Sequence, residues 1–568
     1  MLGVRVVGEG DVALACMSAF ADELVRRGLE HACVSPGSRS TPIALALQRH
    51  PNVAVHVHLD ERASAYFALG LAKATGRPVA VACTSGTAVA NLFPAVVEAS
   101  MARVPLVLLT ADRPPELRGV GANQTIDQLE IFGRYVRSFV DAPVPGERPE
   151  PEGWRELAFA AVGQALRLPP GPVHVNLPFR EPLVPEVAEA RAEAPDLRWA
   201  LSIASSASED QVERLAEMLA GVERGAILAG GLREEAPALV RLAEALRWPL
   251  IAEPASGLRV PGALEAGQFL LADGRFASSH VPDLVLQAGA APTSRAGLSF
   301  VASAGQLVIV DPDGLVADPN RRASWSLSVD VHALAAEVAE RVAGRDRSAW
   351  IHEWERADRS ARAAVDGLID GWDEPFEGRI ARDVAAWLPH GSTLVVGSSM
   401  PVRDLDAYMR PRTGIRVLAN RGASGIDGFV STVLGVAASG VRTFALCGDL
   451  TLLHDAGSLL WSARRGHDAV FVVPNNDGGA IFSFLPQAGL PELEALFTTP
   501  HGLDLAAVAT AAGAGHARVD RADGLVPALE RASASAGVWI LEVPSDRERN
   551  VARHREVSQA VSAALAEL

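Results

Sequence analysis

Short apolar runs recur along the whole chain and alternate with longer amphipathic stretches. Most of the runs are rich in β-branched residues and are bounded by Gly, Pro, Asp or Asn. Examples are Val53–Val57, Val79–Cys83, Leu106–Thr110, Val173–Leu177, Gly225–Ala229, Leu284–Gln287, Leu307–Val310, Leu394–Val396, Thr443–Leu446, Ala469–Val473 and Val538–Val543. Such runs are typical of buried parallel strands joined by helices, so the sequence predicts an α/β protein.

Two stretches of the chain are predicted to be linkers. Pro185–Leu197 is rich in Glu, Ala and Pro, whereas Gly344–Glu377 is charged and carries three tryptophans, which favours a helix packed on a domain surface. They divide the chain into three pieces of similar size, 1–185, 195–345 and 375–568. We expect each piece to be a doubly wound parallel-sheet domain, with one architecture used three times.

The composition excludes several classes of partner. Lys and Arg total 52 against 68 Asp and Glu, and the net charge of −16 argues against general nucleic-acid binding and against an anionic membrane as partner. The four cysteines form no CxxC motif, which indicates thiols in a reducing compartment. The start lacks the apolar core of a signal peptide, and no apolar run is long enough to span a membrane. We therefore expect a cytoplasmic protein.

The chain has a single lysine, Lys73, and it lies in an ordinary helical pattern. Arginine cannot form an imine but binds carboxylates through two parallel hydrogen bonds. Any chemistry on a carbonyl group is therefore expected to use an organic cofactor rather than a lysine Schiff base.

A possible metal site follows two strands of the third piece. Thr443–Leu446 leads into Gly448 and Asp449, and Ala469–Val473 leads into Asn475 and Asn476, with Gly478 just beyond. The 27 residues from Asp449 to Asn476 equal one helical crossover, which places both side chains at neighbouring strand ends. Carboxylate and amide oxygens there would suit Mg²⁺ holding a diphosphate. The alternative is two ordinary strand-to-helix turns.

A carboxylate follows a strand of the first piece. Val53–Val57 leads into Asp60 and Glu61, and a helix begins directly after them. A partly buried glutamate at a strand end has a raised pKa and suits proton transfer. The alternative is that Asp60 and Glu61 only place favourable charge in the first turn of the helix.

Arginines and small polar residues recur on loops between strands and helices, which favours a substrate with more than one carboxylate. The alternative for any single arginine is a surface ion pair. The set comprises Ser38, Arg39, Arg113, Asn123, Gln124, Arg295, Ser399, Arg403 and Arg421. The segment Thr84–Thr87 fits either a phosphate-binding loop or a helix cap, and we favour the cap.

Gly448-Asp449 with Asn475-Asn476 resembles the diphosphate–metal motif of thiamine diphosphate enzymes, and Glu61 resembles their cofactor-activating glutamate. Leu450 departs from the wider pattern, in which a glycine is common. Further strings are similar to the 2-succinyl-5-enolpyruvyl-6-hydroxy-3-cyclohexene-1-carboxylate synthase family of menaquinone biosynthesis. They are Ser35–Pro42, Asp60–Arg62, Thr110–Leu117, Gly121–Gln124, Asn420–Gly428 and Gly478–Pro486.

The resemblance implies pyrimidine-binding, central and pyrophosphate-binding domains for the three pieces. It implies a transferase that decarboxylates 2-oxoglutarate and adds the succinyl carbanion to isochorismate by conjugate addition. Asp449, Asn476 and the Gly478 carbonyl would bind Mg²⁺ or Mn²⁺, beside Gly448 and Leu450 at the cofactor, and Glu61 would activate it. A homodimer or larger assembly would share active sites between chains.

The resemblance also implies roles for the loop residues. Ser399, Arg403 and Arg421 would hold 2-oxoglutarate, and Ile426 and Phe482 would form apolar walls around the cofactor. For isochorismate the implied residues are Ser38, Arg39, Arg113, Asn123, Gln124 and Arg295. Two alternatives stay open: another thiamine diphosphate carboligase or decarboxylase, such as an acetolactate synthase, and a non-catalytic relative that senses a ligand. The several arginines argue against a monoanionic substrate, and the intact Glu61, Asp449 and Asn476 argue against a sensor.

Overall fold

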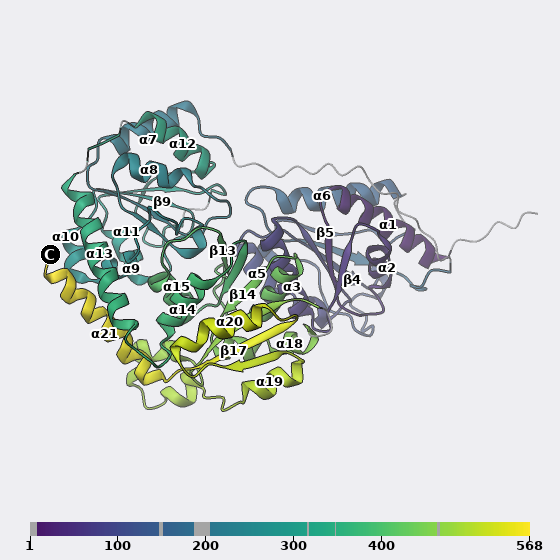
Figure 1. Ribbon diagram of the computed structural model, residues 1–568. Coiled ribbons are helices and arrows are strands. Elements are labelled where there is room, and N and C mark those ends of the chain that lie inside the picture. The colour runs from purple at the N-terminus through teal and green to yellow at the C-terminus, as the bar shows by residue number, and fades with distance from the viewer. Residues whose placement is uncertain are drawn as a thin grey trace, which may run out of the picture. The chain divides into compact units, whose positions relative to one another are not determined.

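The structure is a computed structural model, and it describes residues 8–146, 151–186, 205–314, 317–342, 344–346, 348–462 and 466–568. The chain forms two compact units (Figure 1). The first comprises Met1–Ser202, Asn420–Val441 and Leu453–His467, and the second comprises Ile203–Ala419, Arg442–Leu452 and Asp468–Leu568. Three parallel sheets are built on this frame, one in the first unit and two in the second.

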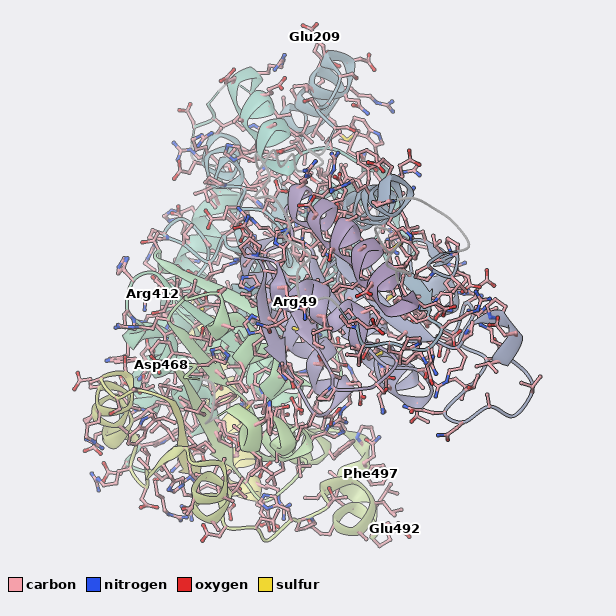
Figure 2. The ribbon with its side chains drawn as sticks, turned by 90° about the vertical axis from the view of Figure 1, so that its right-hand side faces the viewer. Arg49, Glu209, Arg412, Asp468, Glu492 and Phe497 are labelled. Atoms are coloured by element: carbon pink, nitrogen blue, oxygen red, sulfur yellow. The ribbon has the colours of Figure 1, made fainter. Side chains whose placement is uncertain are left out.

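The helices form because their apolar residues recur at helical spacing, as α7 (Glu209–Ala220) illustrates. Its start is a capping box, in which Ser208 and Gln211 each accept a backbone N–H from the other. Val212, Leu215, Ala216 and Leu219 are buried on one face. Charged side chains such as Glu209 lie on the exposed surface (Figure 2).

The first sheet has six strands, and every neighbouring pair is parallel. In spatial order the strands are β2 (Ala54–Val57), β1 (His31–Val34), β3 (Val79–Cys83), β4 (Leu106–Asp112), β6 (Val173–Pro178) and β5 (Phe139–Asp141). The chain starts at β1, adds β2 on one side and then turns back to β3 on the other. Loops at such a reversal of strand order are the usual place for a ligand site in an open α/β sheet.

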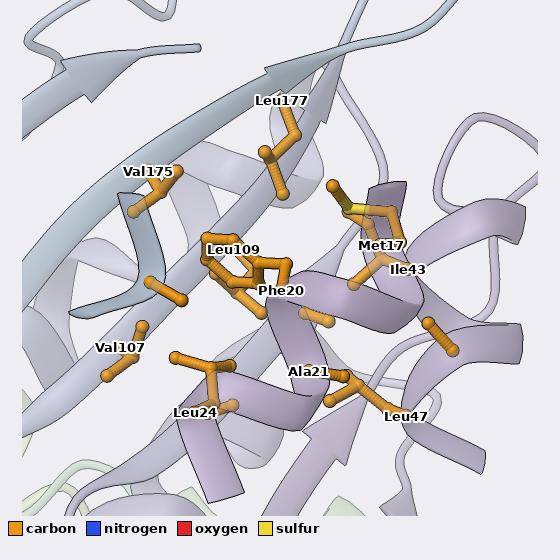
Figure 3. Close-up of a cluster of buried hydrophobic side chains, with 14 of the residues drawn as sticks. Met17, Phe20, Ala21, Leu24, Ile43, Leu47, Val107, Leu109, Val175 and Leu177 are labelled. Carbon is orange, nitrogen blue, oxygen red and sulfur yellow. The ribbon is translucent and has the colours of Figure 1, made fainter. Parts of the chain in front are cut away.

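One face of the first sheet holds a large apolar core (Figure 3). Met17, Phe20 and Leu24 project from α1 at spacings of three and four residues and pack over Leu109 of β4 and Val175 of β6. Ala80 and Ala82 of β3 belong to this core, whereas the intervening residues point to the opposite face, where α3 packs on β1 and β3. Helices therefore cover both faces. The helices of this unit are α1 (Glu9–Arg26), α2 (Thr41–Arg49), α3 (Glu61–Thr75), α4 (Thr87–Asn91), α5 (Phe93–Met101), α6 (Pro151–Leu166), α16 (Phe429–Ala438) and α18 (Ala456–Ser462).

The second sheet has five parallel strands, in the order β11 (Ala323–Leu327), β10 (Gln306–Val310), β9 (Leu284–Ala288), β7 (Gly225–Ala229) and β8 (Leu250–Ala252). Alternate residues of β7 enter two different cores, so helices cover both faces here as well. One core includes α7, α8 (Ala238–Leu246) and α12 (Val331–Arg341). The other includes α9 (Gly267–Ala272), α10 (Gly274–Ser279), α11 (Arg295–Ser303) and α13 (Ala349–Ile369).

The third sheet repeats the strand order of the first. Its six parallel strands run β13 (Ile415–Ala419), β12 (Ser392–Val396), β14 (Thr443–Leu446), β15 (Ala469–Asn475), β17 (Val538–Pro544) and β16 (Gly515–Arg518). α14 (Glu377–Trp387), α15 (Met400–Tyr408) and α20 (Leu525–Ser533) share one apolar core with it. The remaining helices of this region are α17 (Asp449–His454), α19 (Leu505–Ala512) and α21 (Arg547–Ala566). The prediction of three doubly wound parallel sheets is confirmed.

All eleven strands predicted from apolar runs are present. The region Gly344–Glu377 is confirmed as helical and packed, because it contains α13 with Trp354 fully buried. Residues 187–197 of the other predicted linker lie outside the described residues. The chain divides into two compact units, each made of segments from different parts of the sequence. This division does not test the three predicted domain boundaries, which stay a prediction.

Two of the composition-based expectations concern thiols and membranes. Cys16, Cys33, Cys83 and Cys447 are all buried, and no disulfide joins them. Within the described part of the chain, every helix is too short or too polar to cross a membrane.

Candidate active site

Two polar residues meet at the carboxyl ends of neighbouring strands in the third sheet. Asp449 lies three residues beyond the end of β14, and Asn476 directly follows β15, which pairs with β14. The backbone N–H groups of Asn476 and Gly478 donate hydrogen bonds to Oδ2 of Asp449, at 3.2 and 3.0 Å. The structure thus brings together the residues that the sequence singled out for a metal.

The Asp449 carboxylate is almost fully enclosed, with 1% of the residue exposed. Burial raises its pKa, although the N–H groups of Gly478 and Leu450 favour the charged form and oppose this shift. The Nε2 atom of His501 lies 3.4 Å from Oδ2. Asp449 is therefore a carboxylate held in place by donors, with its charge incompletely compensated by the protein.

Asn476 presents an oxygen that has no protein partner. Its Nδ2 donates to Oε1 of Glu377 at 2.9 Å, which turns the amide so that Oδ1 faces away from Glu377. That oxygen is buried and accepts no hydrogen bond from any described residue. An unpaired buried acceptor costs about 1–3 kcal/mol, so its orientation calls for a ligand to satisfy it.

Gly478 adopts a backbone conformation that only glycine tolerates. Its φ is +140°, and a Cβ atom here would lie 2.3 Å from the carbonyl oxygen of Thr498. The Gly478 carbonyl accepts one hydrogen bond, from the N–H of Ala480 at 3.0 Å. A second lone pair on this oxygen remains for a ligand.

The donor set fits a small hard cation. The Asp449 carboxylate, Oδ1 of Asn476 and the Gly478 carbonyl are the oxygen types that Mg²⁺ and Mn²⁺ prefer. In the described ranges, no three His, Cys, Asp or Glu side chains gather to hold a metal, so this site relies on neutral oxygens beside one carboxylate. Open space adjoins Gly448, where a Cβ would meet no atom within 4 Å.

Other predicted residues of the second unit lie in turns and helices that flank the second and third sheets. Ser399 precedes α15 with a φ of +73°, and its carbonyl accepts from Nη1 of Arg403 at 2.6 Å, one helical turn later. The centroid of the Phe482 ring lies 5.4 Å from that of Phe497, which is labelled in Figure 2. Arg295 is the first residue of α11 and is exposed.

In the first unit, Glu61 is the first residue of α3 and follows β2. Asp60 caps the helix, because its carboxylate accepts the N–H groups of Arg62 and Ala63 at 2.8 and 3.2 Å. Glu61 is half-buried, and no cation of the described residues pairs with it. Burial, assisted by the charge of Asp60, raises the pKa of Glu61. The two acidic residues are therefore used differently: Asp60 caps the helix, and Glu61 presents a half-buried carboxyl group with a raised pKa.

Arg39 and Arg113 form a buried pair of like charges. They are 7% and 8% exposed, and the pKa of Arg113 is lowered by burial and then by the charge of Arg39. Arg39 donates to the Phe179 carbonyl at 2.9 Å and to Oε1 of Glu181 at 2.8 Å. Two enclosed guanidinium groups that repel each other electrostatically favour an anionic ligand.

Ser85 links this pair to the loop of Gln124. Its hydroxyl donates to the Gln124 carbonyl at 2.9 Å and accepts from Arg113, while Gln124 Nε2 donates to the Ser85 carbonyl at 3.2 Å. The expected helix cap at Thr84–Thr87 is wrong: Gly86 precedes α4 and no side chain caps this helix. The Ser85 hydroxyl is instead engaged by residues distant in sequence. Ser38 and Asn123 lie on exposed loops.

Residues 420–428 form the loop between β13 and α16, and they belong to the first unit. Arg421 and Ile426 are both half-buried on this loop. The Arg421 side chain forms no hydrogen bond or ion pair with the described residues, so its guanidinium is available to a ligand. The predicted site residues thus fall into two groups. The first unit carries Ser38, Arg39, Glu61, Arg113, Asn123, Gln124, Arg421 and Ile426, and the second carries Arg295, Ser399, Arg403, Gly448, Asp449, Leu450, Asn476, Gly478 and Phe482.

Three family models match most of the chain in succession. Residues 15–131 match the N-terminal TPP binding domain of thiamine pyrophosphate enzymes, residues 195–396 match the middle domain, and residues 403–543 match the C-terminal TPP binding domain. Individual relatives show to which family of thiamine pyrophosphate enzymes the chain is similar. The 2-succinyl-5-enolpyruvyl-6-hydroxy-3-cyclohexene-1-carboxylate synthase of Chloroflexus aurantiacus is 44% identical, with 97% of each chain covered. The synthases of Thermobifida fusca and Rubrobacter xylanophilus are 44% and 42% identical, covering 97% and 95% of this chain and 99% and 96% of theirs.

The chain belongs to the 2-succinyl-5-enolpyruvyl-6-hydroxy-3-cyclohexene-1-carboxylate synthase family of thiamine pyrophosphate enzymes. The fold of this synthase-family member is shared with benzoylformate decarboxylase from Polynucleobacter necessarius. The TM-score is 0.72 over 94% of this chain and 98% of that one, at 17% identity.

Sequence reasoning missed two residues that contact the candidate metal site of this synthase-family chain, Glu377 beside Asn476 and His501 beside Asp449. Glu377 begins α14 and orients Asn476, and burial with the charge of Asp404 raises the pKa of Glu377 to about 7. His501 follows η6 (Leu493–Thr498) by three residues and approaches Asp449. Glu377 and Asn476 are 99 positions apart, and the sequence gives no local signal that they meet. His501 adjoins no strand end, so strand-end patterns do not point to it.

Proposed function

We propose that this chain decarboxylates 2-oxoglutarate and joins the remaining four-carbon succinyl unit to the ring alkene of isochorismate. The product is 2-succinyl-5-enolpyruvyl-6-hydroxy-3-cyclohexene-1-carboxylate, an intermediate of menaquinone biosynthesis. The observation that carries the proposal is the buried oxygen set of Asp449, Asn476 and Gly478, in a chain related over 97% of its length to a synthase of that name. We further propose a cytoplasmic enzyme.

The second unit would hold the cofactor's diphosphate through a divalent metal. Asp449, Oδ1 of Asn476 and the Gly478 carbonyl would bind Mg²⁺ or Mn²⁺, with Gly448 and Leu450 alongside the diphosphate. Asp449 would supply the only negative charge among these ligands. In domain terms, we assign pyrimidine binding to 1–185, a central domain to 195–345 and pyrophosphate binding to 375–568.

Glu61 would act on the pyrimidine end of the cofactor. Its half-buried carboxyl, with a raised pKa, suits a hydrogen bond to a ring nitrogen and the exchange of a proton there. Ile426 and Phe482 would exclude water as apolar walls. When bound, thiamine diphosphate supplies the electron sink for the charge left as carbon dioxide departs.

The arginines would distinguish the two substrates. Arg403 and Arg421, with Ser399, would hold the distal carboxylate of 2-oxoglutarate, which pyruvate lacks. Arg39 and Arg113 would bind isochorismate carboxylates, with Ser38, Asn123, Gln124 and Arg295 contributing further contacts. The buried like-charge pair supports this assignment, because two enclosed guanidiniums are stabilised by a bound anion.

The direct test is mass spectrometry of the products after incubation with thiamine diphosphate, Mg²⁺, 2-oxoglutarate and isochorismate. We expect the adduct together with carbon dioxide, and neither with the Asp449→Ala variant. Release of carbon dioxide from pyruvate but not from 2-oxoglutarate would assign the chain to acetolactate synthase-like chemistry. Cofactor binding without turnover of either acid would favour a ligand sensor.

We propose a homodimer or larger assembly in which Glu61 of one chain and Asp449 of another serve the same cofactor. The two residues belong to different compact units, so one site can be completed by two chains. Subunits carrying Glu61→Ala, mixed with subunits carrying Asp449→Ala, should regain roughly a quarter of wild-type activity if they pair at random as dimers. No recovery after confirmed subunit exchange would contradict shared sites.

A further inference from the structure

The only lysine of the chain is buried in the first unit. Lys73 lies near the end of α3, and 9% of its side chain is exposed. Its Nζ atom donates to Oδ1 of Asn420 at 2.8 Å and lies 3.3 Å from Oε1 of Glu98 on α5. A buried ammonium requires such compensation, because an isolated charge in the interior is strongly unfavourable. Lys73 is thus bound to the start of the loop 420–428.

The Glu98 side chain binds the backbone of the same loop. The N–H groups of Gly422 and Ala423 donate to its two carboxylate oxygens, at 3.0 and 2.6 Å. The loop lies so close to α5 that a Cβ atom on Gly422 would be 2.7 Å from the Glu98 carbonyl oxygen and 2.8 Å from the Ala102 nitrogen. The residues on either side of Arg421 are therefore bound to α3 and α5, Asn420 through its side chain and Gly422 through its backbone N–H.

The other end of the loop is also held by α3. The Tyr66 hydroxyl donates to Oδ2 of Asp427, and Gly428 has a φ of +62°, where a Cβ atom would collide with the Tyr66 ring. Glu61, Tyr66 and Lys73 stand on one helix. A single rigid element therefore carries the proposed proton-exchanging carboxyl and grips both ends of the loop that bears Arg421 and Ile426.

An ammonium suits this position better than a guanidinium. Lys73 meets oxygens of Glu98 and Asn420 from different elements, and a compact NH₃⁺ group can direct separate donors to both. A planar guanidinium is larger and holds its donors in a fixed fork, which suits one planar acceptor rather than two acceptors from different elements. Lys73 is the single lysine of the chain, and all its other strongly basic side chains are arginines. A lysine at this one position indicates that the shape of the cation matters here as well as its charge.

We propose that Lys73 and Glu98 are positioning residues that hold the loop 420–428 so that Arg421 meets the carboxylate of the 2-oxo acid substrate. The inference rests on the proposed function for the role of Arg421. The contact network itself does not depend on that function. Binding of the 2-oxo acid should therefore be more sensitive to Lys73 than binding of the second substrate.

The kinetic test compares Lys73→Met with Arg155→Met, which removes another partly buried ion pair of this unit, that of Arg155 with Asp22. We expect Lys73→Met to raise KM for 2-oxoglutarate by about tenfold or more while KM for isochorismate changes little. In the double variant Lys73→Met/Arg421→Ala, KM should be no worse than in Arg421→Ala alone, because both changes remove the same contact. Arg155→Met should lower Tm without this split. Equal damage to both KM values, or additive effects in the double variant, would overturn the proposal.

Hydrogen exchange tests the loop independently of any substrate. The amides of Gly422 and Ala423 should exchange faster in Lys73→Met and in Glu98→Gln than in wild type, while exchange across the first-sheet strands stays unchanged. Lys73→Arg keeps the charge and provides a second variant should the methionine variant not fold; it should show the same faster exchange. Unchanged exchange would overturn the proposal. Faster exchange in a protein that turns over no 2-oxoglutarate would locate the failure in the proposed function instead.

Discussion

The first and third sheets share one strand order but carry different chemistry at the carboxyl ends of their strands. In the first sheet the loops present a half-buried carboxyl, Glu61, and two enclosed arginines. In the third sheet they present a carboxylate, an unpaired amide oxygen and a carbonyl around Asp449. The topology determines where a site forms, and the loop residues determine what it does.

The difference also appears in how each group is held. Asp449 is fixed by backbone N–H donors from the adjacent strand end, so the neighbouring turn builds the site directly. The arginines of the first sheet are held through side chains and carbonyls from more distant loops, such as Phe179 and Ser85. A rigid cradle suits a metal, whereas a set of long cationic side chains suits a carbon skeleton with carboxylates.

The largest expected effect comes from removing the carboxylate of the third sheet. Asp449→Ala should abolish metal-dependent binding of thiamine diphosphate and reduce activity to background, because it deletes the only charged ligand. Titration of intrinsic tryptophan fluorescence with the cofactor, with and without Mg²⁺, measures this. Asp520→Asn, at an exposed position of the same unit, is the matched control and should bind normally. Retained binding in Asp449→Ala would contradict the assigned metal site.

The next effect tests whether the first sheet performs proton exchange rather than binding. Glu61→Gln should lower kcat by about 10²–10⁴-fold, because an amide cannot exchange the proton, while the cofactor's Kd changes far less. Steady-state kinetics and the fluorescence titration on the same samples give both values. If Glu61→Gln lost cofactor binding as completely as Asp449→Ala, the contrast between the two sheets would fail.

A smaller effect separates the two arginine groups. Arg403→Ala should weaken use of 2-oxoglutarate by about 2–5 kcal/mol, because it removes a charged hydrogen bond to a carboxylate, and should leave isochorismate binding nearly unchanged. Arg113→Ala should show the reverse pattern, and the exposed Arg518→Ala should change neither. The KM values for 2-oxoglutarate and isochorismate, measured for each variant, show which substrate each arginine serves. Equal damage to both substrates by Arg403→Ala would show that the arginines are wrongly allocated.

The smallest of these effects concerns Glu377, whose carboxylate accepts a hydrogen bond from Nδ2 of Asn476 and so orients this proposed metal ligand. Glu377→Leu should weaken Mg²⁺ binding by roughly 10–100-fold in the presence of the cofactor, because the amide loses the acceptor that sets its orientation. Glu377→Gln keeps an acceptor oxygen and should have a smaller effect. Isothermal titration with Mg²⁺ measures the affinity. Equal Mg²⁺ affinity in wild type and Glu377→Leu would show that Glu377 does not orient Asn476 for metal binding.

Every interior strand except β1 was among the predicted apolar runs, whereas of the edge strands only β2 was. β5, β8, β11, β13 and β16 were absent from the predicted runs, and all five lie at sheet edges. Edge strands pair on one side only and several here are short or partly exposed; β8 spans three residues and β16 contains His516 and Arg518. The remaining additional strand, β1, is the one expected before the loop of Ser38 and Arg39.

By itself the sequence determined the parallel α/β architecture and the residues that follow each strand, since burial and strand ends leave a local pattern. It therefore pointed to Glu61, Asp449 and Asn476. Only the tertiary structure decided their partners: Glu377 beside Asn476, Ser85 beside Arg113, and Lys73 beside Asn420 across 347 positions. Such contacts join elements that meet only after the sheets have assembled, so their hydrogen bonds leave no periodicity or spacing along the chain.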